Sequence, residues 1–232
     1  MFHDTGTTQR YPLRHPENNN LSLHYGPTFD GWPIQECKGP FIREYLSDLK
    51  HTIELAMAEY PRVLAVRVDL RLPQGIELPE YVYTNQVISR FFESFTRKIQ
   101  YHQERVRERG YARGCKVRYV WSREIGEGGR QHYHLLILLN RDAYYTLGRL
   151  GSDRVNMISR IEESWAGALR LPADLMRGLV HIPKKAEYQI DRVNRRRKGA
   201  ELTDLFYRAS YLCKVATKRY GDRQRGFGTS RG

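Results

Sequence analysis

The segment from His132 to Asn140 (HYHLLILLN) constrains the fold of this chain more than any other. Every residue from Leu135 to Leu139 is aliphatic, so a strand built from them is apolar on both faces. A strand of this kind is typical of the centre of a sheet that is covered on both sides. It is also the longest aliphatic run in the chain, and it is much too short to cross a membrane.

Hydrophobic periodicity predicts further helices and strands around this segment. Helical spacing predicts helices from Pro40 to Pro61 and over residues 85–109, 142–170 and 203–219. Alternating or β-rich runs predict strands over residues 62–72, 115–124, 131–140 and 178–190. Pro183 weakens the last of these strands and favours an edge position for it. The Gly-rich connector at residues 125–130 is short enough for a hairpin.

The order of these elements is β-α-β-β-α-β, followed by a C-terminal helix. It predicts an α+β fold with a single domain, whose antiparallel sheet has the split βαβ, ferredoxin-like arrangement. We place this domain at residues 41–220. Residues 1–40 are rich in Asn, Pro, Gly, His and Thr and have no sustained period, which predicts an irregular N-terminal arm. Residues 221–232 are expected to form a basic C-terminal tail.

Positive charge is concentrated in the last fifth of the chain. The formal net charge is +13, and the segment from Lys184 to Gly232 contributes +9 of it, with fourteen Lys or Arg against five Asp or Glu. Such a segment binds polyanions in a salt-dependent way. The sixteen tyrosines add aromatic faces on which single-stranded nucleic acid can stack. Nucleic acid is therefore the expected partner, although a solubilising tail has the same composition.

Cysteine usage bears on the compartment in which the chain folds. Cys37, Cys115 and Cys213 lie far apart and include no CxxC pair. An odd number of widely spaced cysteines argues against a disulfide framework and favours a reducing cytoplasm. The residues after Met1 contain no apolar stretch of the signal-peptide type. We therefore expect neither an extracellular mini-protein nor a membrane protein.

The histidine pair at the start of the central strand is the sharpest chemical feature. Side chains alternate along a strand, so His132 and His134 project from one face about 7 Å apart while Tyr133 points the other way. Two imidazoles on one face can share a divalent cation. Two hydrogen-bonded core histidines would show the same pattern.

A third ligand is available across the predicted hairpin. Glu124 ends the preceding strand, and antiparallel pairing would return it close to the histidines. One carboxylate with two imidazoles makes a mixed nitrogen and oxygen site with open positions, which suits Mg²⁺ or Mn²⁺. Glu127 in the connector is a competing ligand. Alternatively, Glu124 is a surface carboxylate paired with Arg123 or Arg130.

The predicted C-terminal helix carries a second set of reactive groups. At about 100° per residue, Tyr207, Tyr211, Lys214 and Lys218 fall within a stripe roughly 60° wide. A phenol titrates near 10, so it needs a cation or a base to act as a nucleophile at neutral pH. Lys214 lies one turn from Tyr211 and could supply that stabilisation. A solvated helix face would carry the same residues.

At these residues the sequence resembles the HUH endonuclease superfamily. His132-Tyr133-His134 matches its histidine-hydrophobic-histidine element, and Tyr211-x-x-Lys214 matches its nucleophile motif. More narrowly, the chain is similar to YagK/YfjJ-domain proteins and to the replication initiators of filamentous phages. That likeness rests on the order VWSRE, HYHLLILLN and YRASYLCK, and it covers roughly residues 62–220.

The resemblance implies a role for each matched residue. His132 and His134 would be metal ligands and Glu124 the third ligand of an Mg²⁺ or Mn²⁺ ion. Tyr211 would be the nucleophile and Lys214 its helper. Tyr207 stands where two-tyrosine members keep a second nucleophile, but some relatives use a single tyrosine.

The resemblance also implies a reaction and a setting. Members nick one DNA strand at an origin or hairpin, stay linked to the 5′ phosphate through tyrosine and release a 3′ hydroxyl that primes rolling-circle replication. The setting would be a phage, satellite or related mobile element in the cytoplasm of a bacterial host cell. The sequence has no Walker-type GxxxxGK[ST] motif, so a host helicase would unwind the duplex. The residues expected to follow the single-stranded or hairpin DNA are Lys184, Lys185, Arg195, Arg196, Arg197, Lys198 and Lys218.

Two other functions fit the same residues. One is a non-catalytic DNA-binding or regulatory protein that keeps the fold without the chemistry. The other is a Zn²⁺-dependent hydrolase in which the histidines bind the metal and Tyr211 is incidental.

Overall fold

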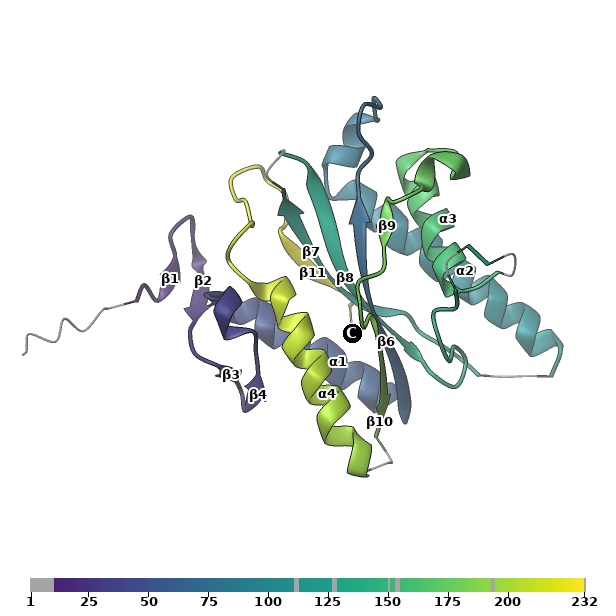
Figure 1. Ribbon diagram of the computed structural model, residues 1–232, viewed down its shortest axis with the longest axis horizontal. Helices are drawn as coiled ribbons and strands as arrows, with labels where there is room; N and C mark the ends of the chain where they lie inside the picture. The colour runs from purple at the N-terminus through teal and green to yellow at the C-terminus, as the bar shows by residue number, and fades with distance from the viewer. Residues whose placement is uncertain are drawn as a thin grey trace, which may run out of the picture.

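A computed structural model describes residues 11–110, 113–126, 129–149, 151–152, 155–192 and 195–231 (Figure 1). Among these residues the largest sheet has six strands in the order β10-β6-β8-β7-β11, and β9 also pairs with β6. All of these pairs are antiparallel. The strands are β6 (Arg62–Arg71), β7 (Arg118–Ile125), β8 (Gln131–Asn140), β9 (Val180–His181), β10 (Glu187–Asp191) and β11 (Phe227–Thr229).

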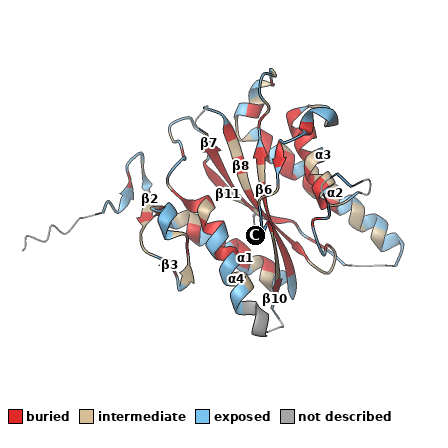
Figure 2. Cartoon of the chain, in the orientation of Figure 1, coloured by how far each residue is buried: buried red, intermediate tan, exposed pale blue. Residues whose placement is uncertain are grey.

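Four α-helices in the described part of the chain cover the two faces of this sheet. They are α1 (Arg43–Glu59), α2 (Gln86–Glu108), α3 (Met157–Leu169) and α4 (Arg195–Ala209). Helices α2 and α3 lie on one face, and α1 and α4 lie on the other (Figure 1). The strands between them are largely buried, whereas the helices are exposed on their outer sides (Figure 2). The structure therefore confirms the prediction of a single domain that mixes helices with an antiparallel sheet.

Strand alternation separates the two cores. On β6, Leu64 and Val66 pack toward α2 and α3, while Val63 and Ala65 pack toward α1 and α4. Strand β8 lies between β6 and β7 and is antiparallel to both along its length. The all-aliphatic run in β8 therefore lies at the centre of the sheet, where both of its faces meet a core.

One predicted helix is shorter than its periodic pattern. Residues 142–170 were expected to be helical, but α3 begins only at Met157. The reason is a capping box, in which the Asn156 side chain accepts a hydrogen bond from the Ser159 amide while Ser159 accepts one from the Asn156 amide. Gly148 reinforces this start, because its φ of +88° lets the chain turn against Asn156.

The prediction for the C-terminal helix was wrong in both of its boundaries. Instead of spanning 203–219, α4 ends at Ala209 and is followed by the short 3₁₀ helix η4 (Ser210–Cys213). Lys214 is extended and forms an isolated β-bridge with Phe41. Tertiary pairing with the N-terminal part of the chain therefore overrides local helical preference at this point.

The two edges of the large sheet also differ from the strand and the tail that the sequence predicts. The predicted strand at 178–190 is split into β9 and β10 by a turn at Lys184 and Lys185, where Lys185 has a φ of +55°. Both pieces pair with β6, as expected for an edge position. The expected tail at 221–232 contains β11, which pairs with β7. Gly228 lies opposite Trp121, and a Cβ atom at Gly228 would lie 2.7 Å from the indole ring.

The N-terminal region is more regular than the predicted arm, whose first ten residues lie outside the described part. From residue 11 onward it forms a sheet of β1, β2 and β5 and a two-stranded sheet of β3 and β4. These strands are β1 (Arg14–His15), β2 (Asn18–His24), β3 (Thr28–Phe29), β4 (Trp32–Pro33) and β5 (Phe41–Ile42). Further short 3₁₀ helices are η1 (Glu36–Lys38), η2 (Glu80–Tyr83) and η3 (Ala173–Met176). Among the described residues, no helix combines the length and apolarity that crossing a membrane requires.

Candidate functional site

Strand register brings the predicted ligand residues together at one end of the sheet. Glu124 on β7 lies directly opposite His132 on β8, and Asp69 on β6 lies directly opposite His134. Both histidines project to the face that α1 and α4 cover, since they share the parity of Leu136, which packs in that core. Three neighbouring strands therefore supply side chains to one point.

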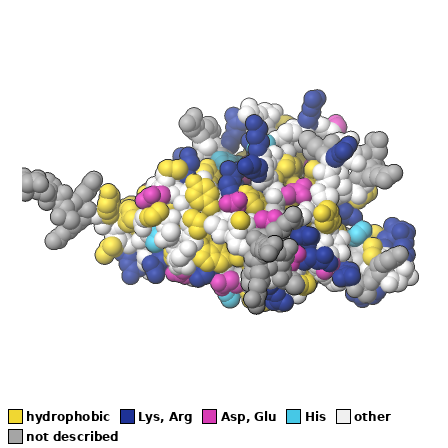
Figure 3. All heavy atoms as spheres, turned by 60° about the horizontal axis from the view of Figure 1, so that its bottom comes forward, with side chains coloured by type: hydrophobic (Ala, Val, Ile, Leu, Met, Phe, Trp, Pro, Cys, Tyr) yellow, Lys and Arg dark blue, Asp and Glu magenta, His cyan; other side chains and the backbone are white. Residues whose placement is uncertain are grey.

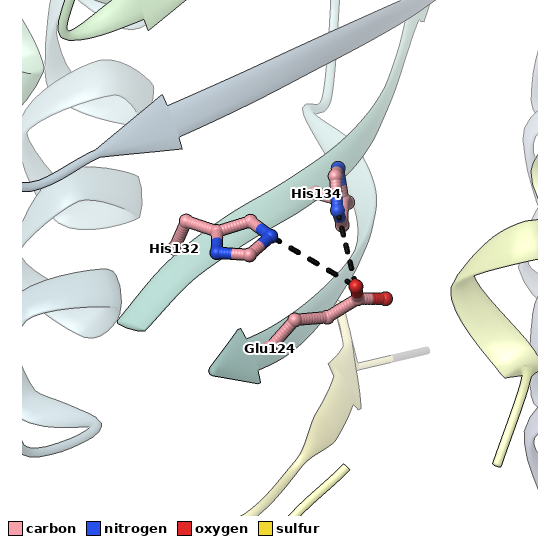
Figure 4. Close-up of side chains that lie close together, drawn as sticks. All are labelled: Glu124, His132 and His134. Atoms are coloured by element: carbon pink, nitrogen blue, oxygen red, sulfur yellow. Dashed lines mark ion pairs between the residues drawn. The ribbon is translucent and has the colours of Figure 1, made fainter. Parts of the chain in front are cut away.

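Glu124, His132 and His134 form a compact cluster (Figure 4). Glu124 Oε2 lies 3.8 Å from His132 Nε2 and 3.5 Å from His134 Nε2. The candidate ligand atoms of the three residues all lie within 4.8 Å of one another. Glu124 is only 2% exposed, so the alternative of a surface carboxylate is wrong. The competing ligand Glu127 lies outside the described residues.

Asp69 orients one of the two imidazoles. His134 Nδ1 lies 2.6 Å from Asp69 Oδ1, which leaves Nε2 to face Glu124. His134 Nε2 is buried and has no hydrogen-bond partner. A carboxylate that holds the far nitrogen of a ligating histidine is a recurrent feature of metal sites. The unpartnered nitrogen and the mixed donor set therefore fit a divalent cation coordinated by the three side chains.

The carboxylates at the cluster stay ionised, and their contacts with His134 raise the pKa of that imidazole. Burial and the neighbouring His134 charge lower the pKa of His132, so this imidazole is neutral and offers a lone pair. Burial would raise the pKa of Glu124, but the nearby His134 and Lys218 side chains outweigh it and lower that pKa. Likewise, the hydrogen bonds from His134 and His181 overcome burial and lower the pKa of Asp69 to about 2. Glu124 and Asp69 thus remain charged beside the imidazoles.

Two lysines complete the surroundings of Glu124. Lys214 Nζ lies 3.1 Å from its Oε2, and Lys218 Nζ lies 3.3 Å from its Oε1. The side chain of Lys218 is fully buried. The prediction that Lys218 contacts DNA is therefore corrected, because in this structure its ammonium faces Glu124 inside the protein.

Tyr211 lies beside the cluster. Its ring is perpendicular to the His134 imidazole, with 5.3 Å between the two ring centroids. Lys214 donates a hydrogen bond to the Tyr211 hydroxyl and places its ammonium 3.6 Å from the ring centroid. The preceding residue, Ser210, is buried and accepts a hydrogen bond from the Gln35 amide, which fixes η4 against the N-terminal region. The structure therefore brings together the predicted nucleophile, its predicted helper lysine and the candidate metal-binding cluster.

Tyr207 has a different position. It lies on α4, one turn before Tyr211, and its side chain is 40% exposed. Within the described part of the chain, no hydrogen bond joins its hydroxyl to the cluster.

The predicted basic residues lie around the edge strand β10. Lys184 and Lys185 are exposed in the turn between β9 and β10. The run from Arg195 to Lys198 forms the first turn of α4, but its side chains lie outside the described part of the structure. On the face shown in Figure 3, Lys and Arg side chains are spread around most of the rim, with several Asp and Glu side chains nearer the middle.

The sequence reasoning missed two charged residues of β6. Asp69 orients His134, and Arg67 is buried with its Nη1 2.9 Å from the carbonyl oxygen of Arg208 near the end of α4. A signal for both was present, because charged residues recur at alternate positions 67, 69 and 71 in an otherwise apolar strand. Alternation puts them on the face that carries the histidines.

A cavity of about 390 Å³ opens onto the cluster. Its walls include Asp69, His132 and His134, and two arginines, Arg71 and Arg130, also line it. Guanidinium groups bind phosphate oxygens well. The cavity therefore places two guanidinium groups next to the candidate cation site.

Comparison with known proteins shows two relatives of similar length, both from Escherichia coli (strain K12). The chain is 36% identical over 202 residues to the uncharacterized protein YagK, an alignment that covers 84% of this chain and 96% of that protein. It is 32% identical over 204 residues to the uncharacterized protein YfjJ, covering 84% of this chain and 97% of that protein. No solved structure matches the chain.

A family model extends this likeness across nearly the whole fold. The model of the YagK/YfjJ C-terminal domain matches residues 26–230, a wider span than the motifs alone indicated. The match includes most of the N-terminal strands as well as β11. The chain therefore belongs to the YagK/YfjJ C-terminal domain family.

Proposed function

We propose that this protein is a metal-dependent, HUH-type endonuclease that nicks and rejoins single-stranded DNA through Tyr211. The observation that carries the proposal is the position of the Tyr211 ring, 5.3 Å from the His134 ring at the edge of the Glu124, His132 and His134 cluster. A phenol next to a candidate cation site is the arrangement that attack on a phosphodiester requires.

The strand order supports an HUH core. In chain order, the strands β6, β7, β8 and β10 are the first to fourth strands of a β-α-β-β-α-β unit. In the sheet they lie in the order fourth, first, third, second. We interpret this as the split βαβ, ferredoxin-like arrangement, with the histidine pair on its third strand.

Each side chain has a task in the proposed reaction. Glu124, His132 and His134 would hold Mg²⁺ or Mn²⁺, which when bound polarises the scissile phosphate. Tyr211 Oη forms a bond to phosphorus while the bond from phosphorus to the 3′ oxygen breaks. Lys214 stabilises the phenolate, because its ammonium already donates to the Tyr211 hydroxyl. In net terms the phenol loses a proton and the 3′ oxygen gains one, so no further reactant is consumed.

The remaining charge would hold the DNA strand. Arg71 and Arg130 line the cavity at the cluster and would neutralise phosphates next to the reacting one. Lys184 and Lys185 are exposed and, with the run from Arg195 to Lys198, would follow the backbone of single-stranded or hairpin DNA at a replication origin. The released 3′ hydroxyl would prime rolling-circle replication of a phage, satellite or related mobile element in the cytoplasm of a bacterial cell, with a host helicase unwinding the duplex.

The test is capture of the covalent intermediate. The protein is incubated with Mn²⁺ and a random-sequence pool of single-stranded oligonucleotides labelled at the 3′ end, because the DNA on that side of the nick stays on the tyrosine. We expect a labelled protein band on a denaturing gel with the wild type and none with Tyr211→Phe. Binding without any cleavage would indicate a non-catalytic DNA-binding protein. Cleavage that survives Tyr211→Phe without an adduct would indicate a hydrolase.

A further inference from the structure

A second cavity adjoins the candidate site. It has a volume of about 470 Å³ and lies where β6 and β7 end and β8 begins. Four residues line both this cavity and the one at the His–Glu cluster: Leu72, Gln74, Arg130 and Gln131. The two cavities therefore share part of their lining at this end of the sheet.

The walls of the second cavity differ from those of the first. Its lining mixes apolar side chains, among them Ile76, Leu78 and Ile125, with polar and charged ones. Tyr83 at the end of η2 lines this cavity and is 53% exposed. A large aromatic side chain that stays half-exposed beside apolar side chains offers one face to a planar ligand.

Two of the three charged residues that line this cavity form an ion pair. Arg123 lines it and is buried, but its Nη2 lies 2.5 Å from Asp222 Oδ2, and Asp222 lines the cavity as well. This pair leaves no net charge for an anion to bind. Arg130, by contrast, is exposed in the wall that both cavities share. The arrangement suits a ligand with a neutral planar part next to an anionic part.

We propose that the second cavity, here called the base pocket and defined by Leu72, Ile76, Leu78, Tyr83 and Ile125, binds one unpaired base of a DNA strand whose backbone passes the His–Glu cluster. This inference rests on the proposed function and names its substrate contact. The base stacks on Tyr83, and the exposed amide of Gln74 reaches its edge. Small-molecule pockets have volumes of roughly 300–1,000 Å³, and the volume of this cavity falls within that range.

The test separates base stacking from backbone contact. All variants carry Tyr211→Phe, so that no strand is cut, and binding of fluorescent dT20 is compared with binding of an abasic deoxyribose-phosphate 20-mer. Removing one base–aromatic contact costs about 5- to 150-fold in affinity. We expect Tyr83→Ala to weaken dT20 binding by about tenfold and to leave the abasic strand unaffected. Tyr83→Phe keeps the ring and should bind like the parent.

The matched control is Tyr101→Ala, which removes another exposed tyrosine from α2. Circular dichroism and thermal melting check that each variant is folded. Equal loss on both strands, no loss on dT20, or a parent that does not distinguish dT20 from the abasic strand would each overturn the base pocket. Failure of the proposed function has a different signature. In that case Tyr83→Ala still weakens dT20 selectively, while protein with Tyr211 intact forms no adduct in Mn²⁺.

Discussion

Asp69 and His134 lie opposite each other on neighbouring strands and are joined by a 2.6 Å hydrogen bond from the imidazole Nδ1 to the carboxylate. The bond turns the other nitrogen of His134 toward Glu124. Because both residues belong to regular strands of the sheet, the backbone fixes the direction in which His134 Nε2 points. The protein itself thus fixes the orientation of this candidate cation site.

Asp69→Asn should weaken Mn²⁺ binding. The amide oxygen can still accept the hydrogen bond from His134, but the charge that makes the imidazole more basic is lost. Such outer partners are worth about 10- to 100-fold in metal affinity. Isothermal titration calorimetry with Mn²⁺ measures the change, and Asp142→Asn, which alters a carboxylate paired with Arg62, is the control. An unchanged dissociation constant in Asp69→Asn would show that Asp69 serves the fold alone.

His134→Ala should abolish both Mn²⁺ binding and formation of the DNA adduct, even at high metal concentration. This variant removes the imidazole that is more buried than that of His132. His102→Ala is the matched control, because His102 bonds to Tyr144 elsewhere in the fold. Normal adduct formation by His134→Ala would refute its assignment as a ligand.

Lys218→Met should destabilise the protein without changing DNA affinity. The side chain is fully buried against Glu124, and breaking a buried ion pair typically costs about 3 kcal/mol. Urea denaturation gives the loss in the free energy of unfolding. Mn²⁺ should restore part of it, since a bound cation would neutralise Glu124 in place of the lysine. If Lys218→Met keeps full stability but weakens DNA binding, the ammonium reaches the DNA after all.

Replacing Lys184 and Lys185 together by Ala should reduce the salt dependence of binding to single-stranded DNA. Each phosphate contact contributes about 0.7 to the slope of log K against log salt, so the loss of two contacts lowers its magnitude by about 1.4. Fluorescence anisotropy at several salt concentrations gives the slope. A slope equal to that of the wild type would mean that this turn is solvated and does not contact the DNA backbone.

One thiol per chain should react with Ellman's reagent in the folded protein. Cys37 is exposed, whereas Cys115 and Cys213 are buried. Burial raises the pKa of Cys115 to about 12 and raises that of Cys213 as well, so neither forms a thiolate at neutral pH. In guanidinium chloride all three should react. Rapid reaction of two or three thiols without denaturant would contradict the packing around β7 and η4.

Much of the fold could be predicted because its strands follow simple alternation. The parity of His132 and His134, and their proximity to Glu124 across a short connector, follow from a period of two and an antiparallel hairpin. These are local properties that the sequence carries by itself. The central place of β8 followed in the same way from its apolar faces.

The C-terminal segment could not be predicted by the same reasoning. The helical stripe through Tyr207, Tyr211, Lys214 and Lys218 has the right period, yet the helix ends at Ala209 because Lys214 pairs with Phe41. Contacts between residues so far apart in sequence leave no periodic trace. The burial of Lys218 likewise depends on a distant residue, because its partner Glu124 lies on β7.

Strand β11 protects the strand that carries Glu124. Without it, the outer backbone amides and carbonyls of β7 would form an open edge, a template on which a second chain could add a strand and begin to aggregate. The protection depends on an absent side chain, because Trp121 fills the space next to Gly228. Any larger residue at Gly228 would push β11 away from the sheet, so a single substitution there would expose this edge and make the protein prone to precipitate.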